Sequence, residues 1–173
     1  KSVAEEKYAR VVTHLKRPLT HPSWYQETEL GGFLADILQE SLRLDMMLVG
    51  SGSIRVTELG PIVLFSNLTE CIPYDDAAIA LWVKGAQLKK MILYVLRDEV
   101  WDGSHCEFFQ FSGGMRVVYD KSNHKLKEFS LHGAPIEEEK LYKIGLQYYF
   151  YLNLKDFFSI SHEIKSSLSV CVD

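Results

Sequence analysis

The longest regular pattern of apolar positions lies in the segment Glu27–Leu44. Apolar side chains recur there every three or four residues, which places them on one face and predicts a helix. The next segment, Asp45–Val49, is short and almost continuously apolar, which is typical of a buried strand. A strand over Ala77–Val83 and a helix over Gly85–Arg97 repeat this alternation. The apolar positions of the first helix are Leu30, Phe33, Leu34, Ile37 and Leu38.

Shorter elements flank these segments. Ser2–Ala9 is predicted to form a short helix, with Ser2 as its N-cap and acidic residues in its first turn. The β-branched run Val11–Leu15 favours a strand. Asn67–Ile72 is predicted to be a single helical segment, which the following proline ends.

The second half of the chain is rich in strands. Phe108–Ser112, Met115–Asp120, Leu126–Gly133 and Leu141–Leu152 all have the composition of strands, and Gly-Gly, Lys-Ser-Asn-His and Gly-Ala-Pro turns separate them. Two helices packed on a mixed sheet, followed by extra strands, make an α+β fold and not a doubly wound one.

Length, composition and charge describe an ordinary core-forming protein. The chain has 173 residues, of which 47% are hydrophobic and 24% charged, so one domain with one core is expected. The net charge is -4 and no basic cluster is longer than Lys89-Lys90, so we expect no nucleic-acid partner. No apolar stretch approaches the roughly 18 to 20 residues of a membrane helix, so we expect no membrane association.

The cysteines and the start of the chain add two expectations. Cys71, Cys106 and Cys171 are widely spaced and form no CxxC motif or Cys/His pair, so neither a disulfide framework nor a structural metal is predicted. A reducing compartment is favoured. The chain begins with Lys1 and has no apolar signal sequence, which indicates a fragment cut or processed from a longer protein.

Three motifs in the first half follow one another in a distinctive order. Glu27–Asp36 reads ETELGGFLAD, Gly52–Arg55 reads GSIR, and Pro73–Asp76 reads PYDD. They resemble the ETNLGNxxAD helix start, the GGxIR loop and the PFGN turn of the C-terminal domains of the 5'-nucleotidase family. Each motif is weak alone, but their common order makes chance an unsatisfactory explanation.

The second half continues the resemblance. Gly85–Leu88, Phe111–Gly114 and Leu141–Ile144 are similar to the family's TGxxL helix start, VSG loop and closing strand. The match extends from residue 11 to about residue 157, so residues 1–10 are assigned to the end of a linker helix and residues 11–173 to the domain. The PYDD and SGSIR forms resemble a subgroup of bacterial bifunctional metallophosphatases. This implies a cytoplasmic location, with a secreted or cell-surface location as the alternative.

The resemblance implies a pocket for a nucleotide or another phosphomonoester. Tyr74 stands where the family has its first stacking Phe, and Tyr149 aligns with the second. Two aromatic faces hold a planar ring, because each stack contributes roughly 1–3 kcal/mol. Asp76 replaces the family's Asn, and a carboxylate favours hydroxyl or amine donors on the ligand. Tyr149 lies inside QYYFYL, where a core residue of a strand is the alternative interpretation.

The resemblance assigns two further residues to the pocket. Arg55 follows the glycine-containing loop Gly50–Ser53 and resembles the family's ligand-binding arginine, which can fork to phosphate or carboxylate oxygens. The alternative is a surface arginine paired with Glu58. Gly113 matches a loop glycine that lets the ligand approach the backbone, and a plain hairpin turn is the alternative there.

The sequence also departs from the family pattern. Trp24 stands where the family often has an arginine, so one anion contact is missing. The family's GGDGF loop has become Asn153–Phe157, and Glu29 and Gly32 replace asparagines at the helix start. These changes motivate a second hypothesis, namely a degenerate binding or interaction module that keeps the fold without the pocket.

The resemblance places the catalytic machinery elsewhere. Hydrolysis in this family uses two divalent metal ions held by the N-terminal metallophosphatase domain. The histidines of this chain match none of its ligand motifs, and Gly50–Ser53 misses the nucleophile-elbow pattern of serine hydrolases. We therefore expect no catalytic residue, metal or cofactor in this fragment. It is interpreted as the substrate-specificity domain of a 5'-nucleotidase-type metallophosphoesterase, an enzyme of nucleotide catabolism, with its own N-terminal domain as partner.

Overall fold

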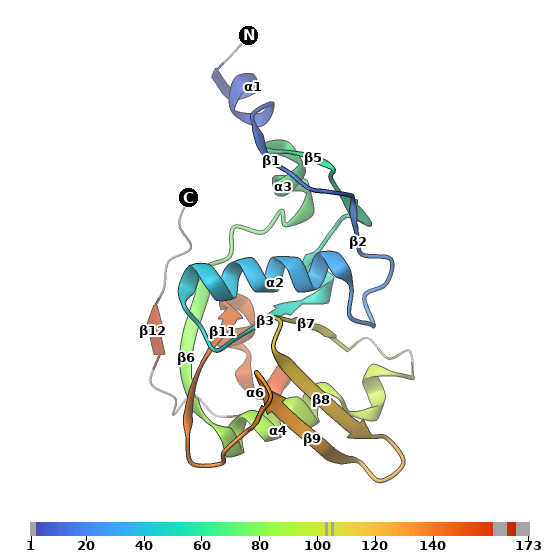
Figure 1. Cartoon of the computed structure of the whole chain (residues 1–173), viewed down its shortest axis with the longest axis vertical. Coiled ribbons are helices and arrows are strands. Elements are labelled where there is room, and N and C mark those ends of the chain that lie inside the picture. The colour runs from blue at the N-terminus through green and yellow to red at the C-terminus, as the bar shows by residue number, and fades with distance from the viewer. Residues whose placement is uncertain (1–2, 103, 105, 161–165, 169–173) are drawn as a thin grey trace.

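A five-stranded mixed sheet forms the centre of the computed structural model, which describes residues 3–102, 104, 106–160 and 166–168 (Figure 1). The strand order is β12-β6-β11-β3-β7, in which β11 runs parallel to β3 and the other neighbours pair antiparallel. The bounds are β3 Met46–Gly50, β6 Ala78–Lys84, β7 Phe109–Phe111, β11 Leu141–Gln147 and β12 Ser166–Leu168.

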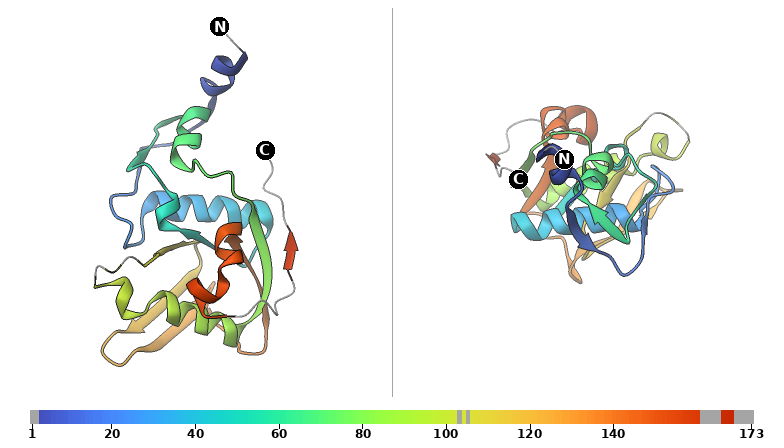
Figure 2. Two further views of the ribbon diagram at one scale, coloured as in Figure 1. Left: turned by 180° about the vertical axis from the view of Figure 1, so that it is seen from behind. Right: turned by 90° about the horizontal axis from the view of Figure 1, so that it is seen from above.

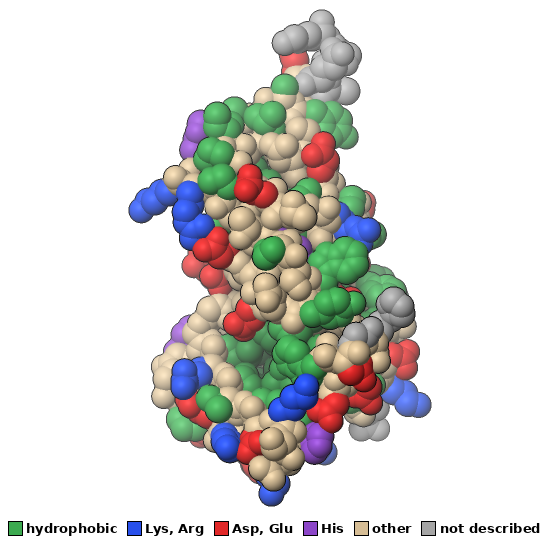
Figure 3. Space-filling view, turned by 90° about the vertical axis from the view of Figure 1, so that its right-hand side faces the viewer, with side chains coloured by type: hydrophobic (Ala, Val, Ile, Leu, Met, Phe, Trp, Pro, Cys, Tyr) green, Lys and Arg blue, Asp and Glu red, His purple; other side chains and the backbone are tan. Residues whose placement is uncertain are grey.

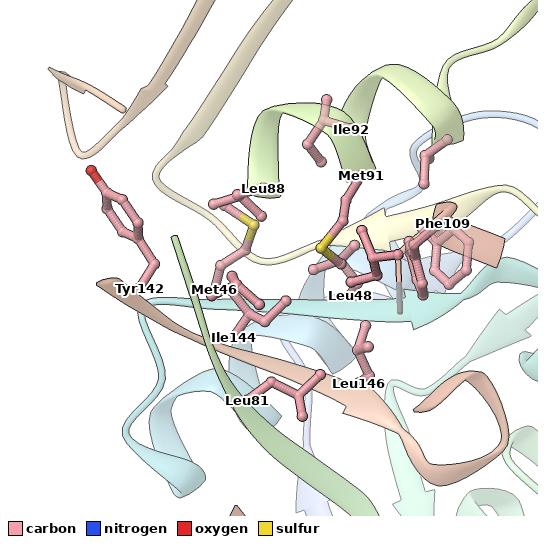
Figure 4. Close-up of a cluster of buried hydrophobic side chains, with 14 of the residues drawn as sticks. Met46, Leu48, Leu81, Leu88, Met91, Ile92, Phe109, Tyr142, Ile144 and Leu146 are labelled. Atoms are coloured by element: carbon pink, nitrogen blue, oxygen red, sulfur yellow. The ribbon is translucent and has the colours of Figure 1, made fainter. Parts of the chain in front are cut away.

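Strand β3 is buried on both faces of this sheet, as its continuous apolar run predicts. Met46 and Leu48 belong to the larger core cluster, which includes residues of helix α4, whereas Met47 and Val49 pack with residues of helix α2. Successive side chains of a strand point to opposite faces, so one strand supplies both cores. Figure 4 shows Met46 and Leu48 among the side chains of the larger cluster.

Three helices cover the two faces of the sheet. α2 (Glu29–Leu42) packs on β3 and β7, and α4 (Gly85–Val95) lies on the other face together with α6 (Leu154–Phe158). The Thr28 hydroxyl caps the start of α2 by accepting from Gly31 N–H at 3.1 Å. α2 ends at Leu42, and the left-handed backbone of its C-cap Arg43 (φ 52°) lets the Arg43 N–H bond back to the last turn.

A second, three-stranded antiparallel sheet follows in the chain order β8 (Met115–Asp120), β9 (Lys125–Leu131) and β10 (Ala134–Pro135). Phe129 and Leu131 of β9 join the larger core cluster, so this sheet packs on the α4 side. Seen from the right of Figure 1, the surface carries charged side chains of both signs, and its lower half is hollowed where hydrophobic side chains come into view (Figure 3).

A small N-terminal layer stands above α2 in Figure 1. Two short antiparallel ribbons, β1 with β5 and β2 with β4, join α1 and α3 in this layer. Leu30 and Leu34 of α2 pack into it against Ile54 and Val63. The bounds are α1 Val3–Tyr8, β1 Val11–His14, β2 Leu19–Thr20, β4 Glu58–Leu59, β5 Ile62–Leu64 and α3 Phe65–Cys71.

The predicted α+β class is confirmed, as are the long helices and central strands, but one prediction is wrong. The segment Leu141–Leu152 is not one strand, because β11 ends at Gln147 and residues Tyr148–Leu152 form helix α5. The helical turn buries Phe150 against Phe109, at 4.9 Å between ring centroids. The predicted N-cap Ser2 lies outside the described residues.

A buried polar cluster joins three segments at one end of α2. Gln110 of β7, fully buried, accepts from Thr28 N–H at 2.9 Å and donates to Gln26 O at 2.8 Å and Ser51 Oγ at 2.9 Å. His21 lies beside them, with Nδ1 2.8 Å from Thr28 Oγ1 and Nε2 3.2 Å from Ser51 O. Burial lowers the pKa of His21, which favours the neutral imidazole, and the contact with Ser51 O opposes this in part.

Substituting Gln110 tests how much the fold depends on this cluster. Gln110→Leu should cost about 2–4 kcal/mol of unfolding free energy, because it leaves buried donors and acceptors without partners. Urea denaturation measures this cost. Gln87→Leu is the control, since Gln87 makes one exposed bond, to Lys84 N at 3.0 Å, and its loss should cost no more than about 1 kcal/mol. Equal costs for the two variants would contradict the prediction.

Candidate ligand-binding cleft

An open cleft of about 850 Å³ lies at one edge of the central sheet. The parallel strands β3 and β11 both end at this edge, at Gly50 and Gln147, and the antiparallel strands β7 and β6 begin beside them. The segments that leave or enter these strands therefore converge around the cleft, as loops at the carboxyl ends of parallel strands commonly do. The lining residues come from segments 24–25, 52–55, 73–76, 106–108 and 147–157.

Four of the five predicted site residues lie together in this cleft. Arg55, Tyr74, Asp76 and Tyr149 all line it, although they come from three distant parts of the sequence. Gly113 does not line it. That glycine follows the far end of β7, where its N–H donates to a carboxylate oxygen of Asp36 on α2. In this position Gly113 connects a turn to a helix and does not open the cleft to a ligand.

The two tyrosines that the sequence motifs indicated both present exposed rings in the cleft. Tyr74 is 51% exposed on the loop between α3 and β6, and Tyr149 is 56% exposed on α5. Tyr149 is supported from behind by Phe150 and Phe157, at 5.3 and 5.7 Å between ring centroids. The rear view in Figure 2 shows α5 and α6 on this side of the sheet. Both rings can therefore offer surface to a ligand, and the neighbours of Tyr149 hold its ring in place.

Asp76 has a structural task besides lining the cleft. Its Oδ2 accepts from the backbone N–H of Tyr149 at 3.1 Å, and the neighbouring Ala77 O accepts from Tyr148 N–H at 2.7 Å. These bonds satisfy N–H groups at the start of α5 that a helix leaves without internal partners. Asp76 thereby couples the loop that carries Tyr74 to the helix that carries Tyr149.

Arg55 is exposed and lies over an aromatic ring. Its guanidinium carbon is 5.3 Å from the ring centroid of Trp24, and its Nη1 donates to Gly52 O at 3.3 Å. Among the ion pairs of the described residues, Arg55 does not pair with Glu58, which was the alternative interpretation. The tryptophan that replaces a family arginine therefore contributes a cation–π contact that orients the remaining guanidinium.

Sequence reasoning missed two polar residues on the floor of the cleft. Glu107 Oε1 accepts from Gly52 N–H at 2.8 Å, and Gln147 Oε1 accepts from Gly50 N–H at 2.9 Å and Ser53 Oγ at 3.2 Å. Burial raises the pKa of Glu107, and the bond from Gly52 opposes this only in part. No local motif marks either residue, because their partners lie on a loop far earlier in the sequence.

The part of the chain that the structure describes shows no metal-binding cluster and no disulfide. Within these residues, no three His, Cys, Asp or Glu side chains gather in a way that could hold a metal ion. No helix in the same ranges has the length and apolar character needed to cross a membrane. Cys71 is buried and Cys106 half-buried, and neither forms a disulfide with another described residue. Burial raises the pKa of the Cys71 thiol to about 11.

The fold and the cleft define an α+β domain with a cleft lined partly by aromatic residues at the ends of its central strands. Residues 10–161 match the family model described as 5'-nucleotidase, C-terminal domain, and the chain belongs to this family. The resemblance found in the sequence motifs is thereby confirmed. No curated protein matches the chain.

Solved structures share the fold at low sequence identity. The 5'-nucleotidase precursor from Thermus thermophilus has a TM-score of 0.75 and 17% identity, with 96% of this chain and 35% of that chain covered. The NAD nucleotidase of Haemophilus influenzae has a TM-score of 0.73 and 14% identity, with 95% of this chain and 34% of that chain covered. A putative 5'-nucleotidase from Staphylococcus aureus has a TM-score of 0.72 and 14% identity, with 96% of this chain and 37% of that chain covered. The chain thus spans about a third of each of these proteins.

The raised pKa of Glu107 gives a prediction about stability. The folded state binds the Glu107 proton more tightly than the unfolded chain does. As the pH rises from the ordinary pKa of 4.5 through the raised pKa of the folded state, ionisation of Glu107 therefore lowers the stability of the fold. Glu107→Gln removes the charge and keeps an oxygen for Gly52 N–H. The variant should therefore match the wild-type melting temperature near about pH 4 and exceed it near about pH 8. A variant that melts lower at the higher pH would show that the carboxylate charge stabilises the loop.

Proposed function

We propose that this chain is the substrate-binding part of a 5'-nucleotidase-type hydrolase, and that its cleft binds the ring end of a nucleotide or a related phosphomonoester. The observation that carries this proposal is the convergence of Arg55, Tyr74 and Tyr149 in one cleft. Two half-exposed rings and one exposed cation form a set that suits a planar ring linked to an anion.

Stacking on the tyrosines supplies the affinity for the ring. An aromatic ring stacked on a nucleobase contributes roughly 1–3 kcal/mol and accepts different bases, because every base has a π-face. The bond from Tyr149 N–H to Asp76 holds α5 in place before the ligand arrives, so little ordering accompanies binding. The cleft volume of about 850 Å³ also falls in the usual range of small-molecule sites.

Arg55 is proposed to bind the anionic end of the ligand. A guanidinium can donate two parallel hydrogen bonds to a phosphate, which fixes both position and orientation. Trp24 on one side and Gly52 O on the other restrict the side chain without neutralising its charge. The positive charge is therefore available to a ligand phosphate or carboxylate.

The hydrolytic step belongs to a part of the protein outside this chain. We propose that an N-terminal metallophosphatase domain would hold two divalent metal ions, which would supply the Lewis acidity for hydrolysis. The chain spans about a third of the solved proteins that it resembles, which leaves room for such a domain in them. A cytoplasmic location stays a prediction from the PYDD and SGSIR sequence forms.

Titration of the chain with small ligands tests the proposal. Isothermal calorimetry with nucleosides, nucleoside monophosphates and phosphosugars should detect binding by at least one of these classes. Tyr74→Ala and Tyr149→Ala should each weaken binding by about tenfold, the effect of losing one stacked ring. Tyr148→Ala is the matched control, because Tyr148 lies on the same helix, is 40% exposed and does not line the cleft.

Two outcomes would contradict the proposal. No binding by any of the ligand classes would favour a degenerate module that has kept the fold and lost the pocket. Binding that is equally tight in Tyr74→Ala, Tyr149→Ala and the Tyr148→Ala control would show that a ligand occupies another place on the molecule.

A further inference from the structure

Glu107 reaches the floor of the cleft across two glycines. Its Oε1 accepts from Gly52 N–H at 2.8 Å, and a Cβ built on Gly50 would lie 3.0 Å from the same oxygen. Ser51 N–H donates to Phe108 O at 2.8 Å, which holds the Glu107 segment beside the loop. Because neither glycine has a side chain, the carboxyl group can occupy space that a larger residue at position 50 or 52 would take.

Gly50 lies between Glu107 and an aromatic side chain of the cleft, Phe150. A Cβ on Gly50 would also lie 2.3 Å from Phe150 Cζ, so the Phe150 ring and the Glu107 carboxyl group both press on this residue. Phe150 is in turn 5.3 Å from Tyr149, measured between ring centroids. Glu107, Phe150 and Tyr149 therefore line the same cleft, with the carboxyl group beside the aromatic side chains.

The second oxygen of Glu107, Oε2, accepts no hydrogen bond from any residue that the structure describes. Among the described residues, the only hydrogen bond to this carboxyl group is the one from Gly52, and no Lys, Arg or His forms an ion pair with it. Burial disfavours its charged form, as the raised pKa reflects. A partly desolvated carboxylate with one oxygen not bonded to a described residue can accept a hydrogen bond from a donor that a ligand brings.

Gln147, which also lines the cleft, has a side-chain oxygen that is already engaged within the protein. Its Oε1 is already held by Gly50 N–H and Ser53 Oγ, which turns its amide nitrogen away from them. The Gln147 oxygen is thus already occupied, whereas Glu107 keeps an oxygen for a donor from the ligand. A carboxylate acceptor favours ligands that bring an N–H or O–H donor, because a ligand without one leaves the carboxylate unpaired. On the ring of a nucleobase, an exocyclic amino group is such a donor.

We infer, on the basis of the function proposed above, that Glu107 is a specificity-determining residue which accepts a hydrogen bond from an amino group on the ring of the ligand. The chain accordingly selects nucleobases that carry an exocyclic amino group over bases that lack it. Stacking on Tyr74 and Tyr149 is common to all bases, so the discrimination comes from this carboxylate.

Two ligand pairs that differ by one amino group test the inference. Adenosine monophosphate is compared with purine riboside monophosphate, and guanosine monophosphate with inosine monophosphate, by calorimetric titration of the chain. In the wild type the amino-bearing member of at least one pair should bind about tenfold more tightly or better. In Glu107→Gln, which keeps the bond to Gly52 and loses the acceptor, the difference should fall to within about threefold.

Asp75→Asn is the matched control for charge. Asp75 is an exposed carboxylate of the same cleft, so its neutralisation should leave the discrimination within each pair unchanged. An equal loss in Asp75→Asn and Glu107→Gln would overturn the inference, since a general charge effect would then explain it. The melting temperature of Glu107→Gln, measured in parallel, establishes that the variant is folded.

The remaining outcomes separate this inference from the proposed function. If all four monophosphates bind, Tyr74→Ala weakens them all, and both pairs bind equally, Glu107 does not determine specificity and the proposed function stands. If discrimination persists in Glu107→Gln, another residue reads the amino group and the inference is overturned. If none of the four binds, the inference also fails, and the proposed function then depends on the phosphosugar arm of the earlier titration.

Discussion

The buried hydrogen bonds of Gln110 are the constraint on which the cleft depends. This one side chain joins β7 to the start of α2 through Thr28, and to the glycine loop through Ser51. A Cβ on Gly31 would lie 2.3 Å from Gln110 Oε1, so only glycine leaves space for the amide at this point of the helix. Buried polar groups need hydrogen-bond partners, so the bond between Gln110 and Ser51 restricts where the loop Gly50–Ser53 can lie.

The direction of the strands explains why the cleft forms where it does. β3 and β11 are parallel and carry their following segments to the same sheet edge, while β6 and β7 start there. The cluster around Gln110 fixes one of these segments, and the bond from Tyr149 N–H to Asp76 fixes two others. A rigid sheet edge with separately anchored loops is a suitable frame for a binding site, since the loop sequences can vary without loss of the fold.

Two departures from the family pattern become intelligible once the contacts are known. Trp24 replaces an arginine, yet its ring lies 5.3 Å from the guanidinium of Arg55 and so supports the cation that remains. Asp76 replaces an asparagine and keeps an oxygen that accepts from the start of α5. Neither change therefore removes the aromatic and cationic parts of the cleft, and the acceptor character of its floor is increased by Glu107.

Local chemistry determined much of this protein without reference to its tertiary structure. The spacing of apolar residues and the Thr28 cap define α2, and a continuous apolar run defines β3, because these signals act within a few neighbouring positions. Aromatic YYFYL favours a strand by propensity alone. Only contacts with Asp76, Ala77 and Phe109 make it a helix. The tertiary structure also placed Gly113 outside the cleft and Glu107 inside it, since desolvation and proximity depend on residues distant in sequence.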